Sequence, residues 1–225
     1  MTGFLASVKN IDEAKKICLS NADIIDFKKV NDGALGFVGS NIIRQGRKVL
    51  QDRIISVTMG NEHNPNNNKT INNINYVIKN KINYLKIGLF DIRMIHEHKK
   101  LIKKINFLET KPICVVFADQ DFDLLLIQKI IDIGYKGVMI DTCNKNGKSS
   151  LDLLNRNDIK KFTDIVKKNN MICGFSGSLK LHHIAELKNL NIDFLGFRGQ
   201  LCIDSKDRDS INMDQVNRVS REIKS

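Results

Sequence analysis

The sequence contains no tryptophan, only three tyrosines and no long apolar run. No stretch approaches the roughly 18 uncharged apolar residues that a membrane-spanning helix needs. Residues 1–20 show neither the basic-then-apolar order nor the small-residue cleavage site of a secretory signal. We therefore expect a cytoplasmic protein with no membrane partner.

Cysteine is also scarce, and no two cysteines form a C-x-x-C pair. The five cysteines are Cys18, Cys114, Cys143, Cys173 and Cys202. Their odd number and wide spacing fit neither a disulfide scaffold nor a zinc site.

The histidines are His63, His96, His98, His182 and His183, and none has a ligand-like spacing to acids or thiols. We interpret them as surface or structural residues and expect no metal and no other cofactor.

The formal net charge is +11, with 36 lysines and arginines against 25 acidic residues. A basic protein can bind nucleic acid, but here the basic residues are spread over most segments instead of forming one tract with aromatics between them. We therefore expect no nucleic-acid partner. A nucleic-acid-binding protein stays the contrasting class, and binding to DNA or RNA that weakens steeply with salt would reveal it.

Short apolar strands alternate with amphipathic helices along the whole chain. The expected strands are 3–8, 24–28, 54–59, 84–88, 113–119, 137–141, 171–175 and 194–197. They are too apolar to have a wet face, which is typical of a parallel sheet covered by helices. Eight such units in 225 residues predict an α/β fold, a single (β/α)8 TIM barrel domain over residues 1–225. A doubly wound open sheet is the alternative, but its G-x-G-x-x-G motif after the first strand is missing.

Three of these strands carry ionisable residues on the face opposite their apolar one. Side chains two apart on a strand share a face, so Asp26 and Lys28 point the same way, and Lys86 and Asp141 are placed alike in the fourth and sixth strands. A buried amine or carboxylate costs several kcal/mol unless it is paired. Because the carboxyl ends of barrel strands form the active site, we expect these four residues and Lys145 to gather at one mouth.

The seventh and eighth expected strands both run into glycine-containing loops. These loops hold Gly177 and Ser178 in one case and Arg198 and Gly199 in the other. Backbone N–H groups, a hydroxyl and a guanidinium can all donate to phosphate oxygens, so we expect a substrate-phosphate site here. The alternative is two tight glycine turns that bind no ligand.

Several segments, in this order and spacing, make the chain resemble the (5-formylfuran-3-yl)methyl phosphate synthases of methanofuran biosynthesis almost end to end. The matching segments are A-D-I-I-D-F-K at 22–28, G-A-L-G at 33–36, Y-L-K-I-G-L at 84–89, M-I-D-T with the later K-N-G-K at 139–148, G-S-L-K at 177–180, and F-R-G with Cys202 at 197–202. One departure is Lys29-Val30, where the family usually has Asn-Pro.

The resemblance implies a TIM barrel lyase that condenses two glyceraldehyde 3-phosphate molecules into the furan aldehyde phosphate, with loss of one phosphate and two waters. It implies that Lys28 forms the Schiff base, that Lys86 is the proton acceptor, and that Asp26, Asp141 and Lys145 are further active-site residues. Another Schiff-base (class I) aldolase acting on a phosphorylated aldehyde is the alternative. We expect a small phosphorylated aldehyde as the substrate and further copies of the chain, in a homo-oligomer, as the partner.

Overall fold

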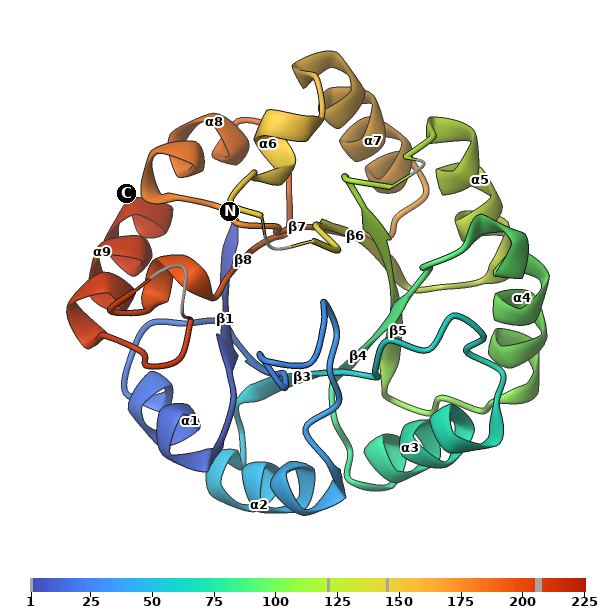
Figure 1. The fold of residues 1–225 in the computed structure, drawn as a ribbon, viewed down its shortest axis with the longest axis horizontal. Helices are drawn as coiled ribbons and strands as arrows, with labels where there is room; N and C mark the ends of the chain where they lie inside the picture. Colours follow the sequence, from blue (N-terminus) through green and yellow to red (C-terminus); the bar gives the residue numbers. More distant parts are fainter. Residues whose placement is uncertain (1, 121, 145, 205–207) are drawn as a thin grey trace.

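The computed structural model describes residues 2–120, 122–144, 146–204 and 208–225. Within this part of the chain, eight parallel strands follow one another around a closed barrel, and the last strand pairs with the first. Helices form a ring outside the strands (Figure 1). The predicted TIM barrel is therefore confirmed, and the open doubly wound sheet is excluded.

The strands are β1 (Gly3–Val8), β2 (Ile24–Phe27), β3 (Ile54–Thr58), β4 (Tyr84–Gly88), β5 (Lys111–Phe117), β6 (Gly137–Asp141), β7 (Ile172–Phe175) and β8 (Phe194–Phe197). The α-helices are α1 (Ile11–Cys18), α2 (Ser40–Leu50), α3 (Asn68–Lys79), α4 (Ile95–Lys104), α5 (Leu124–Ile133), α6 (Ser150–Leu153), α7 (Arg156–Lys168), α8 (Ile184–Lys188) and α9 (Met213–Lys224). Short 3-10 helices are η1 (Ile92–Met94), η2 (Leu181–His183) and η3 (Gly199–Leu201).

Alternate residues of β2 pack into two different hydrophobic clusters. Ile25 and Phe27 pack in the cluster between the strands and the surrounding helices, whereas Ile24 belongs to a smaller cluster inside the barrel. The strand therefore turns Asp26 toward the barrel interior together with Ile24. Parallel pairing sets Asp26 beside Ser7 of β1 on one side.

Asparagine caps fix where two of the helices begin. Asn10 precedes α1, and its side chain accepts a hydrogen bond from the backbone N–H of Glu13 at 2.9 Å. Asn155 separates α6 from α7 and accepts from the N–H of Asp158 at 2.9 Å. Each asparagine satisfies a backbone donor that has no partner within the helix.

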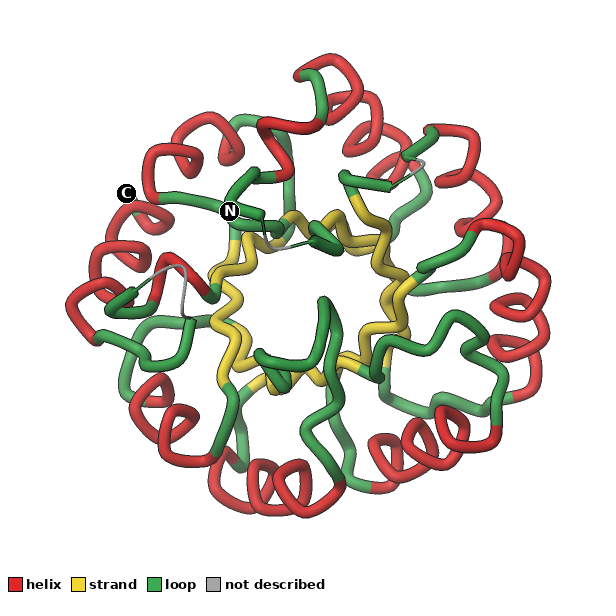
Figure 2. Tube along the Cα trace, viewed as in Figure 1, coloured by secondary structure: helices red, strands yellow, loops and turns green. Residues whose placement is uncertain are grey.

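The loop between β2 and α2 lies over the open end of the barrel (Figure 2). Its Leu35 is fully buried and packs in the interior cluster with Val115 and Phe117. Gly36 holds the base of the loop, since its carbonyl accepts from Lys29 N at 2.9 Å and from Thr58 Oγ1 at 2.7 Å. This loop therefore closes one side of the mouth.

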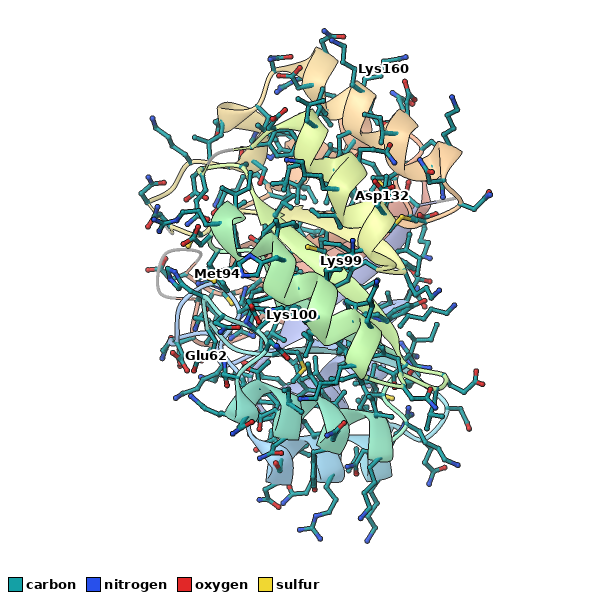
Figure 3. All side chains as sticks on the ribbon, turned by 90° about the vertical axis from the view of Figure 1, so that its right-hand side faces the viewer. Glu62, Met94, Lys99, Lys100, Asp132 and Lys160 are labelled. Atoms are coloured by element: carbon teal, nitrogen blue, oxygen red, sulfur yellow. The ribbon has the colours of Figure 1, made fainter. Side chains whose placement is uncertain are left out.

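The outer helices carry much of the positive charge. Lys99 and Lys100 on α4 and Lys160 on α7 are exposed and project from the ring of helices, with the exposed Asp132 of α5 nearby (Figure 3). Basic side chains on this face are thus mixed with an acidic one. Of the helices described, none is both long enough and apolar enough to cross a membrane.

Candidate active site

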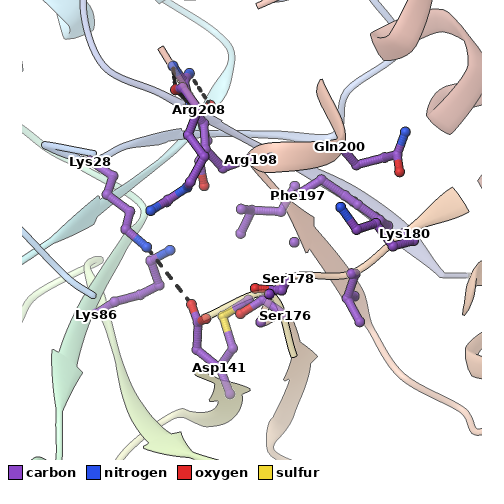
Figure 4. A pocket seen from close by; sticks show the side chains of 18 of the residues that line it. Lys28, Lys86, Asp141, Ser176, Ser178, Lys180, Phe197, Arg198, Gln200 and Arg208 are labelled. Carbon is purple, nitrogen blue, oxygen red and sulfur yellow. Dashed lines mark hydrogen bonds and ion pairs between the residues drawn. The ribbon is translucent and has the colours of Figure 1, made fainter. Parts of the chain in front are cut away.

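Four ionisable side chains meet inside the barrel at its carboxyl end. They are Asp26 and Lys28 at the end of β2, Lys86 of β4 and Asp141 of β6, and none exposes more than 7% of its surface. Figure 4 shows the ends of Lys28 and Lys86 close together, with Asp141 facing them. The structure thus brings together four of the five residues expected at this mouth, and Lys145 lies outside the described residues.

Each lysine lies near a different carboxylate. Lys86 Nζ is 2.7 Å from Asp26 Oδ2, whereas Lys28 Nζ is 4.0 Å from Asp141 Oδ2. Ser7 Oγ donates to the same Oδ2 of Asp26 at 2.9 Å. Two amines and two carboxylates share this low-dielectric interior, and pairing between them offsets the cost of burying a charge there.

The two carboxylates are held in different ways. Asp141 Oδ1 accepts a hydrogen bond from the backbone N–H of Thr142 at 2.7 Å, which orients its carboxylate at the end of β6. Asp26 is completely buried, and its Oδ1 accepts no hydrogen bond from the residues that the structure describes. Asp26 therefore keeps one buried acceptor pointing at no described donor, which is unusual for a buried carboxylate.

A cavity of about 450 Å³ opens above these residues, and we call it the central cavity. Its polar lining includes Lys28, Lys86, Asp141, Ser176, Ser178, Lys180, Arg198, Gln200 and Arg208. Gly177 and Gly199 also line it. Its volume falls in the range of about 300–1,000 Å³ that is usual for small-molecule sites. The chemistry available is that of amines and carboxylates facing a small substrate, the setting in which lysines form imines with carbonyl compounds.

The turn after β7 requires glycine at position 177. Gly177 has φ +96°, and a Cβ there would lie 2.1 Å from Ser150 Oγ. Ser178 follows with φ +52°, so two successive residues are left-handed. No group in the described chain accepts from the backbone N–H of Gly177, Ser178 or Gly199. These N–H groups are therefore available to an anion in the cavity.

Arg198 has different partners from those we expected. Its Nη1 donates to Glu13 Oε2 at 2.6 Å and its Nη2 to Glu13 Oε1 at 3.1 Å, in a buried bidentate ion pair. Nη1 also donates to Ser7 O at 3.1 Å, and Nε donates to Arg208 O at 2.9 Å. Because these bonds engage its donors within the protein, the geometry does not support the phosphate contact expected of the Arg198 guanidinium.

The sequence does not reveal this ion pair, because Glu13 resembles part of a helix cap. Its spacing from Asn10 is that of a helix cap, which already accounts for an acid at that position. In the structure the Asn10 half of the cap is formed, but Glu13 Oε2 accepts from Lys9 N at 2.8 Å and from Arg198. The local motif thus hides a contact between two distant parts of the chain.

Arg208 is a cavity residue that the sequence does not single out. Ten residues separate it from the end of β8, and it lies in a charged, non-periodic stretch. Its side chain is half-buried, and burial lowers the pKa of the Arg208 guanidinium while the charge of Asp141 opposes that shift. No spacing or motif in the sequence distinguishes it from other surface arginines.

No metal centre is built into the described parts of the chain, in which no group of three or more His, Cys, Asp or Glu lies close enough to hold an ion. His98 is fully buried, and its Nδ1 lies 2.6 Å from the hydroxyl of Tyr135. Burial lowers the pKa of His98 to about 4. His98 is thus a neutral core residue at neutral pH, which confirms the structural interpretation for this histidine.

Comparison with known proteins gives the same fold and a family. The chain superimposes on the crystal structure of 3-keto-L-gulonate-6-phosphate decarboxylase from Vibrio cholerae with a TM-score of 0.67 over 99% of this chain and 97% of that one, at 10% identity. Such low identity shows the shared barrel alone. The (5-formylfuran-3-yl)methyl phosphate synthase of Methanosarcina acetivorans is 28% identical over 97% of both chains. The enzyme of that name from Methanocaldococcus jannaschii is 27% identical over 88% of this chain and 89% of its own.

The model of one protein family, described as 4-HFC-P synthase, matches residues 4–220. This range contains every strand of the barrel except the first residue of β1, and all four acid and amine residues at its mouth. The relatives' names are those of a synthase, and thus of an enzyme. The chain therefore belongs to the 4-HFC-P synthase family.

Proposed function

We propose that this protein condenses two molecules of glyceraldehyde 3-phosphate into (5-formylfuran-3-yl)methyl phosphate, releasing one phosphate and two waters. Membership of the family and the names of the relatives support the product. The single observation that supports the chemistry is the pair of buried lysines, each beside its own carboxylate, on the floor of the central cavity. We assign the Schiff base to Lys28 and proton abstraction to Lys86.

The first step is attack of the neutral Lys28 amine on a triose carbonyl carbon. The carbonyl oxygen leaves as water, and the resulting iminium draws electrons from the adjacent C–H bond. The Lys28 amine reaches the substrate from the end of β2, with Asp141 4.0 Å away to exchange protons through the cavity. Asp141 is thus placed to assist formation of the imine rather than to lock the amine as a tight ion pair.

The second step is removal of the acidified proton by Lys86 in its neutral form. General bases act within hydrogen-bond reach of the proton they remove, and Lys86 lines the same cavity as Lys28. Once protonated, Lys86 is stabilised by Asp26, whose Oδ2 is 2.7 Å away. The enamine left on Lys28 expels phosphate or attacks the second aldehyde, and loss of water to an aromatic ring makes the sequence effectively irreversible.

The phosphate groups are assigned to the loops after β7 and β8. Gly177, Ser178 and Gly199 offer backbone donors to the central cavity, and Ser178 adds a hydroxyl. Lys145, which lies outside the described residues, keeps the active-site role that the resemblance implies.

Product analysis tests this proposal. The purified protein is incubated with glyceraldehyde 3-phosphate alone, and the mixture is examined for furan absorbance and by mass spectrometry. We expect the furan aldehyde phosphate together with one equivalent of inorganic phosphate. An intact imine without any furan would contradict the proposed product and favour a class I aldolase of another specificity. Lys28→Arg is the control and should yield no product.

A further inference from the structure

Arg208 is the cavity residue that the proposed chemistry leaves unused. It lines the central cavity, and its half-buried guanidinium makes no hydrogen bond or ion pair with the described residues. Figure 4 shows the labelled Arg208 beside Arg198, on the other side of the cavity from Asp141 and Ser178. A partly desolvated guanidinium without a partner among the described residues favours an anionic ligand, and its planar fork matches two phosphate oxygens.

The backbone of Arg208 is held by the buried Arg198. Arg198 donates to the carbonyl of Arg208 from Nε at 2.9 Å and from Nη2 at 2.6 Å, and to the carbonyl of Asp209 at 2.8 Å. Arg208 itself has φ +59°, a conformation that is uncommon for residues with a side chain. These hydrogen bonds therefore fix a backbone conformation that would otherwise be disfavoured, and with it the direction of the Arg208 side chain.

Glu13 completes this support from the first helix. It holds both terminal nitrogens of Arg198, and both side chains of the pair are at least nine-tenths buried. The Arg198 guanidinium therefore has no donor left for a substrate. It can instead support Arg208, which does have donors available to a substrate in the cavity. The chain thus uses one arginine for structure and presents the other to the cavity.

We propose that Arg208 binds a phosphate group of the substrate and that the Glu13–Arg198 pair is the positioning element that holds Arg208 in place. The proposal rests on the proposed function in taking a phosphorylated triose as the substrate. Arg208 lies on the other side of the cavity from Ser178 (Figure 4), whose backbone N–H is one of the donors described above. A condensation of two triose phosphates brings two phosphate groups into one cavity, and these two places would each receive one.

Binding of inorganic phosphate tests the role of Arg208 without any dependence on catalysis. Calorimetric titrations are made with the wild type, Arg208→Gln, Arg208→Lys and the matched control Arg218→Gln, which removes the same charge from an exposed position on α9. Loss of a hydrogen bond to a charged group predicts that Arg208→Gln weakens phosphate binding roughly ten- to a hundredfold. Arg208→Lys should keep part of the affinity, because it keeps the charge but loses the fork. Affinity in Arg208→Gln equal to that in Arg218→Gln would overturn the proposal, as would a wild type that binds no phosphate.

Imine trapping shows whether Arg208 acts on substrate phosphate. Borohydride labelling of Lys28 is compared between glyceraldehyde 3-phosphate and unphosphorylated glyceraldehyde. We expect the wild type to favour the phosphorylated aldehyde and Arg208→Gln to lose most of that preference while it labels with glyceraldehyde as before. An unchanged preference would refute the assignment. A wild type that labels with neither aldehyde would instead refute the proposed function and leave the phosphate titration to decide on Arg208.

The positioning role of Glu13 has its own variants. Glu13→Gln removes the charge that holds Arg198, and Glu13→Asp keeps the charge but shortens its reach. Both should reduce phosphate affinity and the preference for the phosphorylated aldehyde, with the smaller loss in Glu13→Asp, and neither should change labelling by glyceraldehyde. Folded variants with wild-type phosphate affinity would contradict the positioning role, as would an equal loss of labelling with both aldehydes.

Discussion

Lys28 and Lys86 lie at different distances from Asp141 and Asp26. The separation is 2.7 Å between Lys86 and Asp26 but 4.0 Å between Lys28 and Asp141. In the proposed chemistry Asp26 stabilises a lysine that ends its step protonated, and Asp141 lies near the lysine that forms the imine. The difference in geometry thus matches the two roles that we propose.

The buried ring of His98 should make the stability of the protein depend on pH. Its buried ring titrates at about 4 in the folded protein, whereas an exposed histidine titrates near 6.5. Between about pH 6.5 and pH 4 the histidine is protonated in the unfolded chain but neutral in the folded one. The free energy of unfolding therefore falls as the pH falls through this range, and the contribution of His98 is fully present above about pH 6.5. Between pH 7 and pH 5 this residue should account for about 2 kcal/mol of lost stability.

Urea unfolding at these two pH values measures the effect of His98. His98→Asn keeps a polar atom near the Tyr135 hydroxyl but has no titratable ring, so its stability should depend less on pH than that of the wild type. His96→Asn is the control, because the His96 side chain is exposed. Equal pH dependence of wild type and His98→Asn would contradict the role of His98 burial.

The sequence was sufficient to predict which strand residues face the barrel interior, because strand side chains alternate between two faces. Asp26, Lys28, Lys86 and Asp141 could be placed on the inner face because each alternates with apolar residues that must face the helices. The partner of Arg198 could not be found, since Glu13 is 185 positions away in the sequence. The side chain of Arg208 depends in turn on that long-range contact.

Elements were predictable through their apolar periodicity, but their ends and the loops were less so. The fifth strand was expected at 113–119 and runs over Lys111–Phe117. Asp119 leaves the strand because its carboxylate accepts from the backbone N–H groups of Cys143 and Asn144, both at 2.7 Å. Leu35 likewise fills the barrel interior from a loop, where no period predicts burial.

The turn after β7 should not accommodate a side chain at position 177. Gly177→Ala adds a Cβ at a position with φ +96° and 2.1 Å from Ser150 Oγ. Gly60→Ala is the matched control, since Gly60 has φ +107° and nothing within 4 Å of the added atom. The backbone penalty should cost both variants about 1 kcal/mol or more. Only Gly177→Ala should lose further stability and raise KM for glyceraldehyde 3-phosphate. Thermal unfolding and initial rates measure both effects, and identical behaviour of the two variants would disprove the assigned turn.

Closure of the barrel brings the residues of the site together. Lys28, Lys86 and Asp141 come from β2, β4 and β6, and alternate strands of a TIM barrel contribute side chains to the same layer. The alternation of strands and helices in the sequence was enough to predict this convergence, because the fold fixes which strand ends meet. The alternation was not enough to predict the distances between each lysine and its carboxylate, which support the different roles that we propose for Lys28 and Lys86.

Lys28 is the residue that we propose becomes covalently attached to the substrate, and mapping of the reduced adduct tests this assignment. The protein is treated with borohydride in the presence of glyceraldehyde 3-phosphate and digested, and the modified residue is located by mass spectrometry. The wild type should carry the adduct on Lys28. Lys28→Arg should fold but carry none, because a guanidinium stays protonated and cannot form the imine. Lys86→Arg should still be labelled on Lys28 although it makes no furan. An adduct on Lys86 or Lys145 in the wild type, with Lys28 unmodified, would contradict the assignment of the Schiff base to Lys28.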